Sequence, residues 1–170
     1  MLPTKSTYQN RVTKVASSVS ENSGNPMIVI DFEVAAPNEV EIDGESYVVA
    51  GAVKTKQYFP FRCLNKDGSG VVDNKRTDDA RQRLLKAYEL FGDPQDPAAI
   101  DWDNPPLTPF QNKVVWTRMT CETTEQRDTP TAEQKAANQL GDISTNPVTG
   151  ESLVAHWPKI TEIFGLVAAS

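Results

Sequence analysis

Residues 23–34 read Ser-Gly-Asn-Pro-Met-Ile-Val-Ile-Asp-Phe-Glu-Val, a turn followed by a stretch in which apolar residues alternate with other residues. One side of an extended chain would carry the apolar residues Ile28, Ile30, Phe32 and Val34. The other side would carry Asp31 and Glu33. Because successive side chains of a strand point to opposite faces, this alternation predicts a strand over residues 27–34 with one buried face and one wet face.

The segments on either side also favour strands. Residues 6–19 are rich in β-branched residues with polar residues between them, which is typical of a strand with one solvated face. Residues 40–49 form two short apolar runs around Asp-Gly, a dipeptide that tolerates the positive φ angles of a type I′ turn, and therefore predict a hairpin. We expect its second strand to continue through Gly51, at a bulge or a barrel corner, to about Arg62, with Pro60 at an edge or a strand end.

A single helix is expected in the middle of the chain. The apolar period changes from 2 to 3.6 over residues 77–91, with Thr77 or Asp78 as the cap and Gly92 as the stop. After an acidic loop rich in proline, residues 111–123 predict another strand.

The last third of the chain is less regular. Residues 124–150 are polar and contain two prolines, so they predict an arm or a long hairpin excursion, with a short helix over 132–140. Residues 151–157 predict a returning strand, and residues 160–167 predict an apolar element that packs on the core. The expected organisation is a β-barrel at 1–123 that includes the helix at 77–91, an arm at 124–150, and a returning segment at 151–170.

Composition limits the function classes. With 170 residues, 38% of them apolar, the chain can build one core. No apolar run approaches the roughly 18 residues of a membrane span, and no secretory signal is recognisable, so we expect a soluble cytosolic protein without a membrane partner. Cys63, Cys121 and the single His156 show no metal-ligand grouping, so we expect no metal, no cofactor and no histidine-dependent hydrolase.

One segment resembles a calcium loop only in part. Residues 65–76 offer oxygen ligands at positions one, three, five and nine, and glycine at position six, but position twelve is Arg76 where a bidentate glutamate belongs. We therefore favour a glycine-rich turn. Asp78 and Asp79 suit a helix N-terminus, where the helix dipole favours negative charge.

Positive charge is concentrated in one stretch of an acidic chain. The net charge is −6, but screening over about 8 Å at physiological salt makes local charge more important than the total. Residues 46–66 contain no acid and four bases, namely Lys54, Lys56, Arg62 and Lys66. As long as Pro60 leaves the register unchanged, strand parity places Tyr58 on one face with Lys54, Lys56 and Arg62. The opposite face then carries Val53, Phe59 and Phe61.

Two further strands carry the same combination of bases and aromatic residues. The first twenty residues contain no acid and three bases, Lys5, Arg11 and Lys14, and Tyr8 has the same parity as Lys14. Trp116 shares a face with Arg118, although a tryptophan is also suited to a core. A surface that binds single-stranded nucleic acid needs lysine or arginine side chains along the phosphates and aromatic side chains that stack on the nucleobases. Each stacked nucleobase contributes about 1–3 kcal/mol. The alternative is a solvated outer face with Tyr58 half in the core.

The opening of the chain also carries a family resemblance. Tyr8 and Val12, followed by residues 23–34, resemble the start of a group of bacteriophage single-stranded DNA-binding proteins with an OB-fold. In that group a first strand runs into a Ser-x-x-Gly-Asn-Pro-Met turn and an alternating apolar second strand. The later order of hairpin, basic strand, helix ending at Gly92, strand over 113–120 and turn at 150–152 is similar to the same plan.

The resemblance implies a mainly β protein, an OB-like five-stranded Greek-key barrel whose helix plugs one end between the third and fourth strands. It also implies binding of single-stranded DNA without sequence specificity, in phage DNA replication or recombination, in the host cytoplasm and without catalysis. The expected DNA-binding residues are Lys54, Lys56, Tyr58, Arg62, Arg11, Lys14, Tyr8, Trp116 and Arg118.

Other functions stay open at this point. A phage virion-structural or assembly protein would use the same barrel as a scaffold and the arm as a contact. A nuclease is a more distant alternative, with Asp67, Asp73, Asp78 and Asp79 around a metal. The sequence also leaves open whether the chain forms a homodimer and whether it binds phage or host replication proteins.

Overall fold

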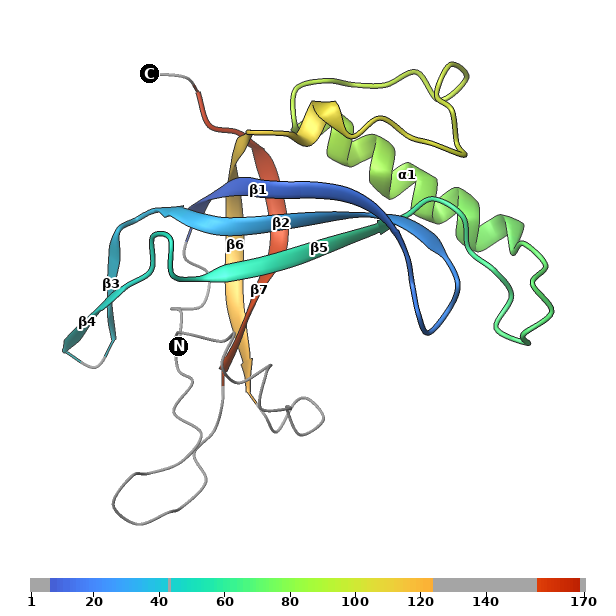
Figure 1. The fold of residues 1–170 in the computed structure, drawn as a ribbon. Helices are drawn as coiled ribbons and strands as arrows, with labels where there is room; N and C mark the ends of the chain where they lie inside the picture. Colours follow the sequence, from blue (N-terminus) through green and yellow to red (C-terminus); the bar gives the residue numbers. More distant parts are fainter. Residues whose placement is uncertain (1–6, 43, 124–155, 169–170) are drawn as a thin grey trace, which may run out of the picture.

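The computed structural model describes residues 7–42, 44–123 and 156–168. Its main sheet has five antiparallel strands in the order β5-β2-β1-β6-β7. Their bounds are β1 Thr7–Val19, β2 Pro26–Ala36, β5 Lys54–Pro60, β6 Val114–Thr123 and β7 His156–Leu166. In Figure 1, β6 and β7 run across the direction of β1, β2 and β5, so the sheet curls into a half-barrel. The fold is mainly β with a single α-helix in the described part of the chain.

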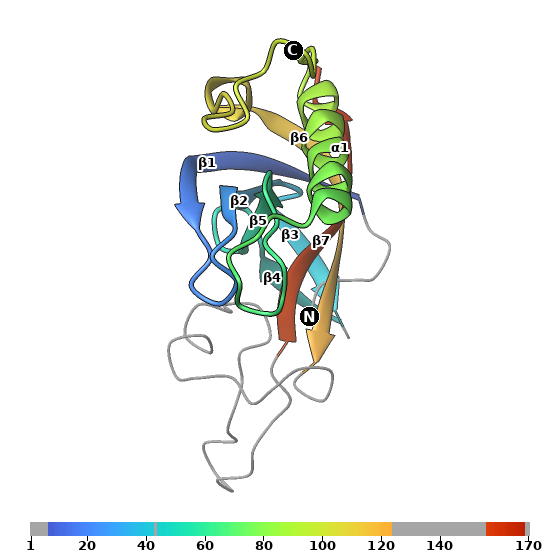
Figure 2. The same cartoon turned by 90° about the vertical axis from the view of Figure 1, so that its right-hand side faces the viewer.

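The two outer strands of the sheet approach each other without forming a ladder. β5 pairs with β2, and β7 pairs with β6. Across the seam, Gln57 Nε2 on β5 donates a hydrogen bond to the Ile160 carbonyl oxygen on β7 at 3.1 Å. Helix α1 (Asn74–Leu90) lies against both β5 and β7 (Figures 1 and 2). The helix therefore covers the seam. No helix in the described residues is long and apolar enough to cross a bilayer.

The alternation in residues 27–34 forms the predicted half-buried strand. Ile28, Ile30, Phe32 and Val34 of β2 are all buried. The core is completed by aromatic rings from α1 and from a 3₁₀ turn at Thr108–Phe110. Tyr88 stacks on Phe110 at a centroid distance of 4.7 Å, and Phe91 meets Phe110 edge-on at 4.9 Å. Such contacts add stability beyond the area that they bury.

The helix begins earlier than the sequence predicted. Asp73 is the N-cap, and its carboxylate accepts a hydrogen bond from the Arg76 backbone N–H at 3.1 Å. The prediction of Thr77 or Asp78 as the cap is wrong because Thr77 lies inside the helix and is buried. Its hydroxyl instead accepts a hydrogen bond from the Cys63 N–H at 2.9 Å. The stop at Gly92 is confirmed, since α1 ends at Leu90 and Gly92 has a φ of +81°.

The predicted hairpin is present, but its second strand is shorter than expected. β3 (Glu39–Ile42) pairs with β4 (Glu45–Val48) as a separate two-stranded sheet. The chain then turns at Gly51, where φ is +73°, and the Gly51 N–H binds the Val34 carbonyl oxygen at 2.8 Å. This turn separates β4 from β5, so the expected continuous strand to Arg62 is wrong.

At the C-terminal end, a single strand replaces the two predicted elements. β7 spans His156–Leu166 and pairs with β6 along this length. The expected arm at 124–150, its helix at 132–140 and the first part of the expected strand at 151–157 lie outside the described residues.

Gly92 gives the first test. A Cβ at this position would lie 2.5 Å from Leu166 Cδ1 on β7, and the positive φ is itself unfavourable for other residues. We expect Gly92→Ala to lower the free energy of unfolding by about 1–3 kcal/mol in urea denaturation. Gly68→Ala is the matched control, because Gly68 has a similar φ of +77° and no atom within 4 Å of the added Cβ. Equal losses in both variants would show that the contact with Leu166 has no effect.

Tyr88 gives a second test, through pH. Its hydroxyl donates a hydrogen bond to the Pro106 carbonyl oxygen at 2.6 Å, and burial together with the charge of Asp93 raises the pKa of the Tyr88 phenol. The neutral phenol is therefore favoured in the folded state. The contribution of Tyr88 to the free energy of unfolding is fully present below the unfolded pKa of about 10, and it is lost as the pH rises above that value. We expect the free energy of unfolding to fall more steeply above pH 10 in the wild type than in Tyr88→Phe. Parallel pH profiles of the two proteins would contradict this assignment.

Candidate functional site

The outer face of β5 carries the charged and aromatic residues that the sequence placed there. Lys54, Lys56 and Tyr58 are exposed, and Tyr58 is 49% accessible to solvent. Val53 and Phe59 are buried on the other side. The outward side chains of β5 are therefore cationic or aromatic, as predicted, whereas the opposite side carries Thr55 and Gln57 as well as the buried Phe59.

Strand pairing extends this face over β2 and β1. Two rows cross the three strands, each with a base on β5, an acid on β2 and a base on β1. The rows are Lys54–Glu33–Arg11 and Lys56–Asp31–Lys14. A third row runs Tyr58–Val29–Ala16. Because neighbouring strands lie only about 4.8 Å apart, all of these side chains belong to one surface. We call Arg11, Lys14, Lys54, Lys56 and Tyr58 the cationic face.

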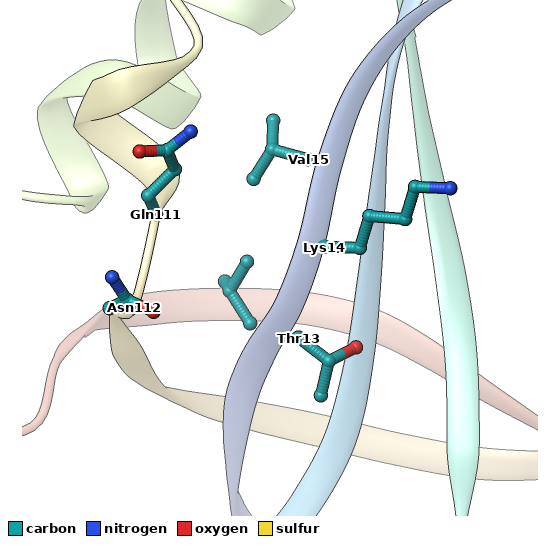
Figure 3. A pocket seen from close by; sticks show the side chains of 6 residues that line it. Thr13, Lys14, Val15, Gln111 and Asn112 are labelled. Atoms are coloured by element: carbon teal, nitrogen blue, oxygen red, sulfur yellow. The ribbon is translucent and has the colours of Figure 1, made fainter.

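A β-bulge explains how Arg11 and Lys14 share this surface. Simple alternation would place positions 11 and 14 on opposite sides of β1. The register with β2 shifts between Val12 and Lys14, which turns Lys14 to the outer side. Figure 3 shows the Lys14 side chain directed over β2 and β5.

The same bulge corrects the prediction for Tyr8. Parity assigned Tyr8 to the side of Lys14, but Tyr8 lies before the bulge and its side chain is fully buried with Val12 in the core. Tyr8 is therefore a core residue and has no surface on which a base can stack.

Arg62 also leaves the predicted face. β5 ends at Pro60, and the Arg62 guanidinium forms an ion pair with the carboxylate of Asp103. The condition that Pro60 leaves the register unchanged is not met, because the strand ends there. Arg62 instead ties the end of β5 to the acidic loop.

Asp31 and Glu33 are the residues of this surface that the sequence prediction left out. Their side chains are 28% and 24% exposed, beneath the longer bases. Lys56 Nζ lies 3.5 Å from Asp31 Oδ1, and Arg11 Nη1 lies 3.6 Å from Glu33 Oε1. Their outward parity on β2 was a usable signal, but only the strand register places them between the bases.

The charge of this face remains positive. Four bases and two acids leave a formal +2 on it, in a chain with a net charge of −6. Lys14 and Lys54 form no ion pair among the residues that the structure describes. Two of the four bases are therefore available to an anion without the loss of an internal pair.

A second group of exposed rings lies on the outer face of β6 and β7. Trp116 and Arg118 share this face as predicted, and Trp116 is 38% accessible. The Arg118 guanidinium lies 5.3 Å from the ring centroid of Phe164 and pairs with Glu162 at 3.2 Å. Phe164, which the sequence prediction missed, is 41% accessible. We call Trp116, Arg118 and Phe164 the aromatic patch.

The aromatic patch is connected to the cationic face through β1. Gln9 and Thr7 pair with Trp116 and Arg118, and Arg11 pairs with Val114 of β6 as well as with Glu33 of β2. The outer surface is therefore continuous from Tyr58 to the patch, although the strands change direction at β6 (Figure 1).

The Ser-Gly-Asn-Pro segment fixes one end of the cationic face. Asn25 is buried, and its side-chain oxygen accepts a hydrogen bond from the Leu64 N–H at 2.8 Å. The Ser20 N–H binds the Asn25 carbonyl oxygen at 3.0 Å. Asn25 thus joins the β1–β2 turn to the chain that follows β5.

The calcium-like segment is a turn with two glycines at positive φ, Gly68 at +77° and Gly70 at +75°. The Asp67 carboxylate accepts a hydrogen bond from the Ser69 N–H at 2.9 Å, and hydrogen bonds from Ser69 lower the pKa of Asp67. Asp73 serves as the helix cap. Within the described residues, no three His, Cys, Asp or Glu side chains are grouped as metal ligands would be.

No protein-family model and no curated protein matches the chain. The function must therefore be inferred from the surface itself.

Proposed function

We propose that the protein binds single-stranded DNA through the cationic face, without strong sequence preference, in phage DNA replication or recombination. The observation that carries this proposal is the strand register, which gathers four bases and an exposed tyrosine on one surface of an acidic chain. Phosphates favour such a surface because bound counterions are released when lysine and arginine neutralise them. The phage setting and the host cytoplasm rest on the resemblance of residues 23–34.

The topology supports an OB-type barrel. Counted without the β3–β4 hairpin, the five strands follow the order third, second, first, fourth, fifth, and the helix lies between the third and fourth. An OB-fold is a partly open five-stranded barrel that binds oligonucleotides over its second and third strands. These strands correspond to β2 and β5, which carry Lys54, Lys56 and Tyr58.

Each residue has a distinct part in the proposed binding. Lys14 and Lys54 contact phosphates directly, while Arg11 and Lys56 exchange a carboxylate for a phosphate. Tyr58 stacks a base, since its ring is half exposed beside the two lysine rows. Trp116 and Phe164 extend the stacking surface, and Arg118 adds charge beside them. No bond is made or broken, so the proposed role is binding without catalysis.

The proposal is tested by fluorescence anisotropy with labelled oligo-dT at several salt concentrations. Wild-type affinity is expected to fall as salt rises, with a log–log slope of about −0.7 for each phosphate contact. The double variant Lys54→Gln/Lys56→Gln should weaken binding and make this slope shallower by about 1.4. Tyr58→Ala should cost about 1–3 kcal/mol of binding with an unchanged slope, because it removes stacking and leaves the charges in place.

Lys75→Gln is the matched control, since Lys75 is exposed on α1 and away from the cationic face. A loss equal to that of a lysine on β5 would mean that binding follows net charge alone. A wild-type protein that forms a defined multimer and binds no oligonucleotide at low salt would instead support a structural or assembly protein.

The interleaved acids give a separate prediction. Asp31→Asn and Glu33→Gln should each tighten binding about two- to fivefold, because a phosphate no longer competes with a carboxylate for Lys56 or Arg11. The same titration measures this effect. Glu21→Gln removes an exposed acid from the β1–β2 turn and should leave the affinity nearly unchanged. Weaker binding of Asp31→Asn or Glu33→Gln would show that the acids position the bases and do not compete with DNA.

A further inference from the structure

A pocket of about 290 Å³ opens where β1 separates from β6. β1 pairs with β6 only over residues 7–11, and the Val12 N–H then binds the Lys113 carbonyl oxygen at 2.9 Å. Beyond this point, within the described residues, β1 is paired with β2 alone. In Figure 3, Val15 lies on one side of the pocket, and Gln111 and Asn112 lie on the other.

The lining of this pocket combines apolar and amide groups. Val15 supplies an apolar side chain, and Gln111 and Asn112 supply two exposed side-chain amides. Val12 also borders the pocket, but its side chain is buried in the core. Asn112 has a φ of +58°, the one positive φ of a non-glycine residue in the part of the chain that the structure describes. Asparagine adopts this left-handed conformation more readily than most residues, and here it lies in the turn between the 3₁₀ helix and β6.

The pocket adjoins the cationic face. Lys14 borders it, but its side chain points over β2 and β5 (Figure 3). Val15, the next residue, faces the pocket. A nucleotide whose phosphate lies at Lys14 can therefore turn its base past the edge of β1 toward Gln111 and Asn112.

We propose that this pocket takes one unstacked base of the bound strand, and that its amides favour adenine. An Asn or Gln side chain can bind N6 and N7 of adenine with a donor and an acceptor together, and Val15 can contact the ring. The volume of about 290 Å³ lies just below the range of roughly 300–1,000 Å³ for pockets of drug-sized ligands, and a single base is smaller than such a ligand. This inference rests on the proposed function and adds a base preference at one position.

The test uses three oligonucleotides in the anisotropy assay: oligo-dT, oligo-dT with one central dA, and the same oligomer with 7-deaza-dA, which lacks the N7 acceptor. The wild type should bind the dA oligomer at least about fivefold more tightly than oligo-dT. It should bind the 7-deaza oligomer no better than oligo-dT. The double variant Gln111→Ala/Asn112→Gly should lose the preference and keep its affinity for oligo-dT, since glycine accepts the positive φ at position 112.

Gln82→Ala is the control, because Gln82 is an exposed amide on α1, and this variant should retain the preference. If all proteins bind oligo-dT with the expected salt dependence but show no preference for dA, the pocket is not a base site and the proposed function stands. A dA preference that survives in the double variant, or that includes 7-deaza-dA, also overturns the inference. Absence of binding to every oligonucleotide would overturn the proposed function and this inference together.

Discussion

β1 connects the two parts of the curled sheet, and a bulge in its middle determines which of its side chains face the core and which face outward. Before the bulge, Tyr8 and Val12 point into the core while the strand pairs with β6. After it, the strand continues beside β2, and Lys14 points to the same outer surface as Arg11. A bulge adds a residue to one strand and increases the local twist. The bulge therefore changes both the side of the sheet to which the following side chains point and the direction of the strand. The cationic face and the pocket beside it both depend on that change.

On the outer surface, the bases that can attract an anion also form ion pairs with the neighbouring acids. Asp31 and Glu33 hold Lys56 and Arg11 at distances of 3.5 and 3.6 Å, but such exposed pairs are individually worth only about 0.2–1 kcal/mol. A phosphate can therefore replace a carboxylate at little cost. In an acidic protein, this arrangement places two acids among four bases and still leaves the face positive.

The residues that follow β5 connect the surface to the helix and the core. The Leu64 N–H is bound by Asn25, and the Cys63 N–H is bound by Thr77. Arg81 Nε donates a hydrogen bond to the Phe61 carbonyl oxygen at 2.9 Å. These contacts direct the chain away from the sheet after Pro60, which is why Arg62 reaches Asp103 and does not continue the row of Lys54 and Lys56. The Phe91 ring, directly after α1, lies 6.3 Å from the Phe32 ring of β2 on the inner side, so the strand that carries Asp31 and Glu33 outside packs on the core beneath it.

The sequence by itself determined the elements whose pattern is local. The alternation in residues 27–34, the Asp-Gly hairpin, the helix stop at Gly92 and the exposed side of β5 all follow from side-chain period and turn chemistry. Tertiary structure decided the rest. Parity cannot detect a bulge, so it misplaced Tyr8, and it cannot locate a strand end, so it misplaced Arg62. The pairing of Lys54 with Glu33 and of Lys56 with Asp31, and the meeting of Arg118 with Phe164, depend on register between strands that are distant in sequence. Register follows from which apolar faces meet in the core and from the turns that join the strands, so it cannot be read from either strand alone.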